Sequence, residues 1–266
     1  MTTGDDNEEV LVAAVVSATM IGSASAADIG ARPYKAPPPY APVYNWTGFY
    51  IFGGGGGGLW SADTNIQDTA TGIPLSVNQR QGGTGWFGTV GAGYDWQFNT
   101  SWVAGIFGDG QFGSIRGTIQ DPSVPLSGTL KMQDAWAVGG RLGYLVAPNV
   151  LSYVNAGYTG SHWSGTDMFD TFSGLPVGVH TDSFNRNGWF VGGGVENSLN
   201  FFGISSPGWF MKTEYRAAWY QRKDISELDA LNTLVGNDIR FKPVVQTIST
   251  SLVYRFNWGG PPVPNY

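Results

Sequence analysis

The sequence has no cysteine, which excludes disulfide bonds and thiolate chemistry. Asp, Glu, Lys and Arg together make up only 13% of the 266 residues, about half of the usual ~25%. There are two histidines, no basic stripe of the kind that binds nucleic acid, and no uninterrupted apolar run of the ~18 residues that a membrane-spanning helix needs. A membrane protein of this composition would therefore have to be a β-barrel, whose strands are apolar only at every second position.

Glycine and aromatic residues are abundant instead. The chain contains 40 Gly, 11 Trp, 12 Tyr and 15 Phe. Many aromatics with few charges disfavour a disordered polar chain, which shows the reverse composition. Residues 53–58 are six consecutive glycines. We expect such small residues to face inward, where they leave room for bulky neighbours and permit strong coiling of the strand.

The first 46 residues are typical of export and tethering. An apolar stretch over residues 10–21 is followed by small residues with A-x-A spacing at Ala24 and Ala26, which predicts a signal peptide over 1–26. Its first nine residues hold four acids and no base, where signal peptides are basic, which favours a misassigned start codon or an altered N-terminus. Five prolines in residues 31–44 predict an extended periplasmic spacer over 27–46, acting as a tether or as a docking segment.

Residues 47–257 are predicted to be all-β, as an eight-stranded antiparallel up-and-down transmembrane β-barrel, with a C-terminal tail over 258–266. Segments with period-two patterning lie near 48–60, 84–96, 101–116, 133–146, 151–161, 187–199, 208–220 and 246–257. The gaps near 61–83, 117–132, 162–186 and 221–245 are long, and those at 97–100, 147–150 and 200–207 are short. This alternation predicts long extracellular loops and short periplasmic turns.

One side of these segments is apolar, and the other carries small, polar or charged groups. Because a Lys or Arg facing lipid at mid-bilayer costs ~2–4 kcal/mol, the charged side must face the lumen. The predicted luminal charge network, structural or gating, consists of Asp109, Arg141, Glu196, Lys212, Glu214, Arg216 and Arg255. Aromatics near the segment ends are predicted to form interfacial girdles: Trp60, Trp86, Trp96, Trp102, Trp136, Tyr144, Trp189, Trp209, Trp219 and Trp258.

Several short motifs resemble one known family. Residues 44–51 (YNWTGFYI) and 252–260 (LVYRFNWGG), together with Gly188-Trp189 and residues 212–215 (KTEY), are similar to the small outer-membrane barrel proteins of alphaproteobacteria. These form the rhizobial-type "porin family" within the OmpA-like transmembrane barrel superfamily. The resemblance spans residues 27–266 and implies an outer-membrane location after Sec-type export. It also implies that the barrel-assembly machinery reads the last strand, with Tyr254 and Phe256 as its signal.

The resemblance has one departure inside the barrel. Phe107 stands where relatives often carry an acid, so the luminal network is expected to be one partner short. The partners that follow from the family are outer-membrane lipids, lipopolysaccharide, the assembly machinery, and host cells or phage at the loops. No cofactor, metal or nucleic acid is expected.

Three functions remain open from the sequence. The favoured one is a structural barrel, and no enzyme, because luminal acids and bases should pair rather than line an open pore. The first alternative is a narrow porin-like channel for ions or small solutes, gated by those pairs. The second is a lipid A-modifying enzyme, which needs a nucleophile beside a base. Its candidate residues would be His162, His180, Ser161 and Ser164, all assigned to or beside the third long loop.

Overall fold

The computed structural model describes residues 45–121, 124–204 and 206–256, so the predicted signal peptide, residues 27–44 of the spacer and the tail lie outside the described residues. Within these residues the only helix is a short 3-10 turn, η1 (Leu199–Phe202), and no helix is long and apolar enough to cross a membrane. The strands are β1 (Gly48–Asp68), β2 (Gln79–Gln97), β3 (Trp102–Asp121), β4 (Leu126–Ala147), β5 (Val150–Trp163), β6 (Thr166–Asp170), β7 (Pro176–Thr181), β8 (Phe184–Ser198), β9 (Trp209–Tyr220), β10 (Lys223–Leu228) and β11 (Leu234–Arg255).

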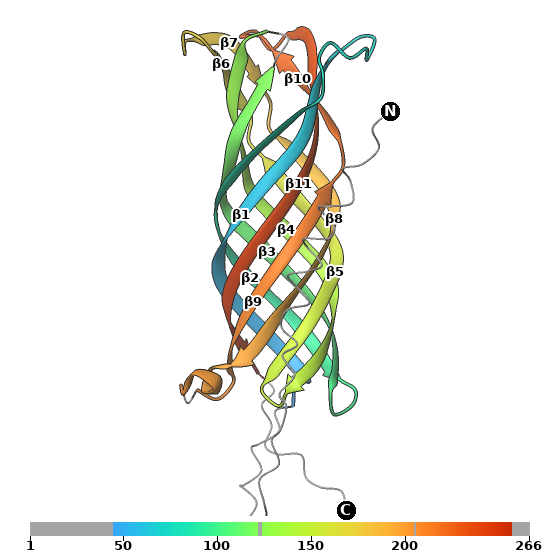
Figure 1. Cartoon of the computed structure of the whole chain (residues 1–266), viewed down its shortest axis with the longest axis vertical. Helices are drawn as coiled ribbons and strands as arrows, with labels where there is room; N and C mark the ends of the chain where they lie inside the picture. Colours follow the sequence, from blue (N-terminus) through green and yellow to red (C-terminus); the bar gives the residue numbers. More distant parts are fainter. Residues whose placement is uncertain (1–44, 122–123, 205, 257–266) are drawn as a thin grey trace, which may run out of the picture. The chain divides into compact units, whose positions relative to one another are not determined.

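Eight of these strands close into a ring, which confirms the predicted barrel. Each strand is antiparallel to both neighbours in the order β1-β2-β3-β4-β5-β8-β9-β11, and β11 pairs back to β1. The strands cross the barrel at a marked tilt (Figure 1). We call the end with the β2–β3, β4–β5 and β8–β9 connections the proximal end. These connections are short: Asn99, for example, accepts the backbone N–H groups of Ser101 and Trp102 at 2.8 and 2.7 Å.

The prediction of long loops at the other end is wrong, because most of these segments are strands. β1 continues to Asp68, β3 to Asp121 and β5 to Trp163, while β4 begins at Leu126 and β11 at Leu234. Most residues of the four long gaps thus belong to hydrogen-bonded strands. We call this part the distal extension: the described residues of 61–83, 115–132, 164–183 and 221–243.

The distal extension is itself a closed ring of eight strands. β6 pairs with β4 at Leu126↔Asp170, β7 pairs with β6, and β10 joins β7 to β11 through Glu227↔Thr181 and Lys223↔Phe241. The order β1-β2-β3-β4-β6-β7-β10-β11 therefore replaces β5, β8 and β9 by β6, β7 and β10 (Figure 1). Short strands close the wall because paired backbone groups satisfy one another and leave no free sheet edge.

The polarity of the two faces reverses along single strands. In β11, Ile248 and Leu252 face outward near the proximal half, whereas Ile239 and Phe241 are fully buried inside the distal extension. β3 behaves in the same way, with Ile106 outward and Ile115 inward. The side-chain period of two is kept, so the environment outside the wall has changed from apolar to aqueous.

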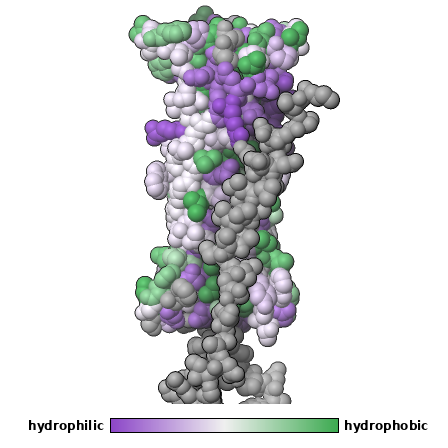
Figure 2. All heavy atoms as spheres, viewed as in Figure 1, coloured by the Kyte–Doolittle hydropathy of each residue, from purple (hydrophilic) through white to green (hydrophobic). Residues whose placement is uncertain are grey.

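The outer surface shows this division directly. Outward aromatics lie on the wall as predicted for girdles, with exposed fractions from 39% (Trp102) to 81% (Trp86); Trp219 is half-buried and stacks on Trp189. Trp60 is a correction, because it points into the barrel and is 1% exposed. Trp258 lies outside the described residues. Hydrophilic side chains gather below the upper, distal end, and hydrophobic ones lie on the distal rim itself (Figure 2).

The six glycines of β1 divide by face. Gly54 and Gly56 lie inward, where a Cβ would sit 2.1 Å from the Thr250 carbonyl oxygen and 2.0 Å from that of Ile248. Around Gly53 and Gly57 the nearest atoms to such a Cβ are 3.8 Å away. The close approach of β1 and β11 thus requires glycine on the inner face, where the strand coils most tightly.

Candidate functional site: the closed lumen

The first cluster of the lumen is a ring of alternating charges from four strands. Arg141 of β4 binds Asp95 of β2 through Nη2–Oδ2 (2.5 Å) and Nε–Oδ1 (2.9 Å), and its Nη1 lies 3.0 Å from Oε2 of Glu196 on β8. Arg255 of β11 closes the ring, with Nη2 2.8 Å from Asp95 Oδ2 and 2.7 Å from Glu196 Oε1. All four side chains are at most 5% exposed. Two cations and two anions cancel, so the cluster is neutral.

Aromatic rings cover the two guanidinium groups of this cluster. The Cζ of Arg141 lies 4.4 Å from the ring centre of Tyr50, and that of Arg255 lies 4.4 Å from the ring of Trp46. Arg255 also donates through Nη1 to the backbone carbonyl of Trp46 at 3.2 Å. Ring faces attract cations, so these contacts offset part of the cost of removing the guanidinium groups from water.

A second neutral cluster lies on β9 and β3. Arg216 makes a bidentate pair with Asp109 (3.0 and 2.7 Å) and reaches Oε1 of Glu214 at 2.7 Å. Lys212 Nζ lies 3.8 Å from Glu214 Oε2, which also accepts from Tyr153 OH at 2.8 Å. Bidentate arginine geometry and the added hydroxyl donor satisfy most of the carboxylate oxygens, as buried ion pairs require.

The structure places all seven residues of the predicted network inside the barrel and divides them between the two clusters. It adds Asp95, which sequence reasoning missed although its alternation with the outward Tyr94 and Trp96 could have found it. Phe107 is inward and packs on Phe190 at 6.1 Å. The sequence led us to expect a network one acid short, because Phe107 stands where relatives often carry an acid. Asp95 supplies an anion from β2 instead, so both clusters are neutral.

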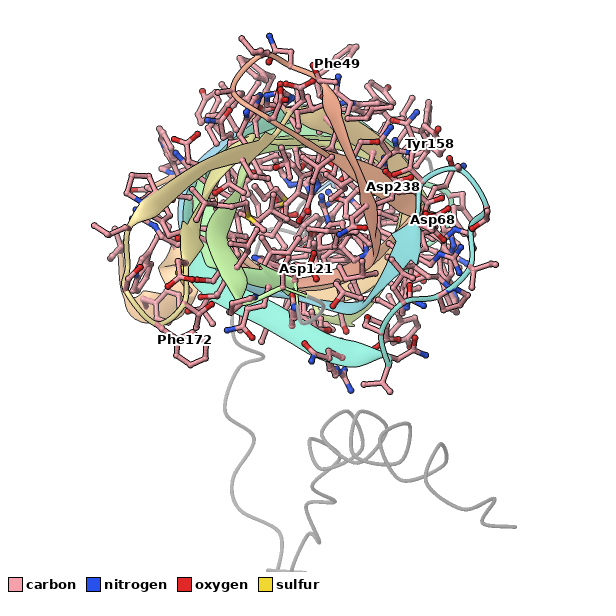
Figure 3. The ribbon with its side chains drawn as sticks, turned by 90° about the horizontal axis from the view of Figure 1, so that it is seen from above. Phe49, Asp68, Asp121, Tyr158, Phe172 and Asp238 are labelled. Carbon is pink, nitrogen blue, oxygen red and sulfur yellow. The ribbon has the colours of Figure 1, made fainter. Side chains whose placement is uncertain are left out.

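Above the clusters, the distal half of the lumen is mostly apolar, and it also holds three buried acids, Asp121, Glu227 and Asp238. We call Trp60, Trp163, Phe184 and Phe241 the aromatic plug. Trp163 lies 5.7 Å from Trp60 and 5.2 Å from Phe241, both edge-to-face, and stacks on Phe184 at 6.2 Å. A cavity of about 10 Å³ lies beside the second cluster and is lined partly by Asp109, Gln111, Thr159, Arg216, Tyr220 and Thr247. That is space for about one water molecule. Seen from above, side chains fill the interior (Figure 3).

The catalytic candidates do not form a site. His162 lies in β5 rather than in a loop, and its Nδ1 is 2.7 Å from Asn185 Oδ1. Ser161 precedes it in the strand and faces the interior, where Trp163 donates to its Oγ at 2.9 Å. Successive side chains of a strand point to opposite faces, so the Ser161 hydroxyl and the His162 ring lie on opposite sides of the wall. His180 lies in β7 and Ser164 just after β5. Among the described residues, no group of three His, Cys, Asp or Glu side chains could hold a metal ion.

Tyr254 and Phe256 lie at the proximal end of β11. Phe256 is 56% exposed, Tyr254 is half-buried, and their rings meet edge-to-face at 5.1 Å. Tyr254 also contacts Trp209. Their predicted use as an assembly signal stays a prediction.

Comparison with known proteins agrees with this architecture. The 31 kDa outer-membrane immunogenic proteins of Brucella melitensis biotype 1 and Brucella suis biovar 1 are each 28% identical to the chain over 254 residues, covering 92% of the chain and 99% of the relative. Among solved structures, the outer membrane protein OprG of Pseudomonas aeruginosa aligns with a TM-score of 0.53 at 9% identity, over 81% of this chain and 100% of OprG. That likeness concerns the fold alone. A family model described as outer membrane protein beta-barrel domain matches residues 13–256. The chain therefore belongs to the outer membrane protein β-barrel domain family and is an integral protein of the outer membrane.

Proposed function

We propose that this protein is a structural barrel of the outer membrane, with a sealed lumen and a distal extension that projects outside the cell. The observation that supports it best is the double closure of the lumen, by two neutral charge clusters and then by the aromatic plug. A conducting pore would need both closures to open together.

The charge clusters are costly to open. Each guanidinium binds two carboxylates, so moving one side chain aside leaves several buried charges without partners. Breaking a buried ion pair costs ~3–5 kcal/mol. The aromatic plug adds a layer with no charged group to coordinate an ion in transit.

The outer surface and the short proximal connections support this orientation. Outward bases lie just beyond the outward aromatics; Arg116 of β3 and Lys131 of β4 are directly opposite one another. Two like charges side by side repel unless an anion lies between them. We propose that the phosphate groups of lipopolysaccharide bind there. The distal turns are then free for contacts with host cells or phage, and the assembly machinery reads Tyr254 and Phe256 from the periplasmic side.

Conductance of the purified barrel in planar lipid bilayers tests the proposal. We expect no stable single-channel openings from protein whose folding is verified by its heat-modifiable mobility in gel electrophoresis. Reproducible large openings from the folded protein would overturn the sealed-lumen proposal.

A narrow channel is the second candidate, because Glu214 binds both Arg216 and Lys212 and these pairs offer alternative partners. This candidate requires a conductance that changes in Glu214→Gln or Arg216→Met. A conductance of the wild-type barrel that both substitutions alter would favour the channel over the structural role.

A further inference from the structure

Two distal turns repeat one sequence. Residues 68–77 read DTATGIPLSV, and residues 170–179 read DTFSGLPVGV. Five of the ten positions are identical, and three of the others exchange similar residues (Thr for Ser, Ile for Leu, Leu for Val). The first copy connects β1 to β2, and the second connects β6 to β7. We call these segments the matched tips.

The matched tips have the same internal structure. Oδ1 of Asp68 accepts the N–H (2.7 Å) and hydroxyl (2.6 Å) of Thr71, and Oδ1 of Asp170 accepts the N–H (2.7 Å) and hydroxyl (2.8 Å) of Ser173. In both, the next residue is a glycine with positive φ, 68° at Gly72 and 70° at Gly174. An aspartate cap followed by a left-handed glycine fixes a turn in one conformation. The tips are therefore preorganised rather than adaptable.

Each tip displays the same pair of apolar side chains to solvent. Ile73 is 60% exposed and its counterpart Leu175 is 64% exposed, while Leu75 is 50% and Val177 is 41% exposed. Rigid, exposed apolar side chains that recur in two places mark an interaction surface more strongly than scattered ones.

The tips lie on opposite sides of the mouth. In the distal ring, β3 and β4 separate them on one side, and β10 and β11 on the other. Figure 3 shows Phe172 of the second tip and Asp68 of the first at opposite sides of the opening. Two equivalent contact points are thus available to one partner that lies across the mouth.

The charge of the distal rim selects the partner. The rim segments 68–78, 121–126, 166–182 and 227–238 contain no Lys or Arg. Of their eight acids, Asp121, Glu227 and Asp238 are buried, and the five at the surface are Asp68, Asp167, Asp170, Asp182 and Asp229. The basic residues of the distal half of the barrel lie farther from the rim and nearer the membrane. They are Arg80, Arg116, Lys131, Arg186, Arg222, Lys223, Arg240 and Lys242. Hydrogen bonds from Thr71 and Ser173 lower the pKa of Asp68 and Asp170, so both stay ionised. An acidic rim repels anionic lipid and a second copy of itself, and attracts a cationic surface.

We propose that the matched tips are a paired docking surface for a basic, amphipathic polypeptide. Its apolar side chains contact Ile73 and Leu75 on one tip and Leu175 and Val177 on the other. Its Lys and Arg side chains face the acidic rim. In the cell this inference rests on the proposed outward orientation of the distal end, whereas the binding itself does not depend on a sealed lumen.

The test uses the full chain in nanodiscs of zwitterionic phosphatidylcholine, with empty nanodiscs as the blank. The probe is a labelled helical peptide of Lys and Leu, compared with a peptide of the same pattern in which Glu replaces Lys. We expect the Lys/Leu peptide to bind and the Glu/Leu peptide not to bind. Ile73→Ser with Leu75→Ser, or Leu175→Ser with Val177→Ser, should each weaken binding by roughly tenfold, because two partly buried apolar side chains are lost.

Three further arms complete the test. Ile204→Ser, at the proximal end and 52% exposed, is the matched control and should bind as wild type. Asp68→Asn with Asp170→Asn keeps an oxygen acceptor for each turn but removes charge, so binding should weaken and depend less on salt. The four-serine variant should bind at the level of the blank, with heat-modifiable mobility verifying its fold.

Equal binding of the Lys/Leu and Glu/Leu peptides, or wild-type binding by the folded four-serine variant, would overturn the proposal. If only one of the two double-serine variants weakened binding, the proposal that both tips bind the peptide together would be overturned. A barrel that conducts ions yet captures the peptide through both tips would contradict the sealed lumen and support this inference, so the two proposals fail separately.

Discussion

The two halves of the lumen solve the same packing problem with opposite chemistry. The proximal half holds eight charged side chains in two neutral clusters. The distal half is filled mainly by the aromatic plug and aliphatic residues such as Ile239, with three buried acids, Asp121, Glu227 and Asp238. The difference follows from the surroundings of the wall. In the membrane the outer face must be apolar, so polar groups collect inside, whereas in water the outer face is polar and the hydrophobic effect can act on the interior. Four predictions test this comparison, from the largest expected effect to the smallest.

Stability of the proximal half should depend on charge rather than volume. Arg141→Met keeps most of the side-chain length but leaves Asp95 and Glu196 short of a partner. We expect a loss of about 3–5 kcal/mol in the free energy of unfolding, measured by denaturant titration in lipid vesicles. The control is Arg222→Met in the distal extension, whose Nε lies 4.0 Å from Asp224 and whose side chain is 55% exposed. That substitution should cost under ~1 kcal/mol. Equal losses would contradict the importance of burial.

The distal half should depend on volume instead. Leu130 is fully buried beneath the rim. Leu130→Ala should cost about 2–4 kcal/mol, because it leaves a cavity in a packed interior. Leu130→Met conserves volume and should cost under ~1.5 kcal/mol in the same titration. If Leu130→Met were as damaging as Arg141→Met, the two halves would not differ in the way proposed.

Adjacent glycines of the run in β1 allow the crowding of the inner face to be compared with that of the outer face. Gly56→Ala places a methyl group 2.0 Å from the Ile248 carbonyl oxygen and should cost about 1–3 kcal/mol. At Gly57 the nearest atom is 3.8 Å away, so Gly57→Ala should be neutral or stabilise the strand by up to ~1 kcal/mol. Comparable losses at both positions in urea titrations would show that the inner face is no more crowded than the outer one.

A buried acid gives the distal extension a pH dependence. Glu227 of β10 is fully buried, and among the described residues neither of its carboxylate oxygens has a hydrogen-bond partner. Burial, together with the charges of Asp121 and Asp238, raises its pKa from 4.5 to about 7. The folded state then holds this proton more tightly than the unfolded state, so its contribution to stability is lost as the pH rises from about 4.5 to 7.

Glu227→Gln should remove that loss. We expect the variant to be more stable than wild type by about 1–2 kcal/mol at pH 8 and equal to it at pH 4. Thermal unfolding in detergent at both pH values measures the difference. A stabilisation that is the same at pH 4 and pH 8 would show that the effect is one of packing rather than of ionisation.

The eight-stranded ring in the membrane could be predicted from the sequence because one physical rule governs it. Every crossing strand must be apolar outside, so the alternation around Arg141, Glu214 and Arg255 identifies the inner face without knowledge of the fold. The inward position of Asp95 could have been predicted from the same rule. Which of these side chains form ion pairs could not be predicted from the sequence, because partners on different strands meet only through the tilt and register of the closed barrel.

The distal extension could not be predicted from that rule. There the alternation reverses, as at Ile115 and Ile239, and a pattern search for apolar outer faces ends each strand too early. β6, β7 and β10 span only five or six residues each and are bordered by turns, so they read as loop in a sequence. Trp60 was assigned to the girdle for the same reason, because a strand that continues past it was taken to end there.

The pairing of β11 has a consequence for how the molecule is completed. This strand contacts β9 and β10 along one side and β1 along the other, from Asn237 to Arg255. Neither the eight-stranded ring in the membrane nor the distal ring is closed without β11. β11 therefore closes both cylinders at once, and a chain that has not yet placed this strand has an open wall over its whole height.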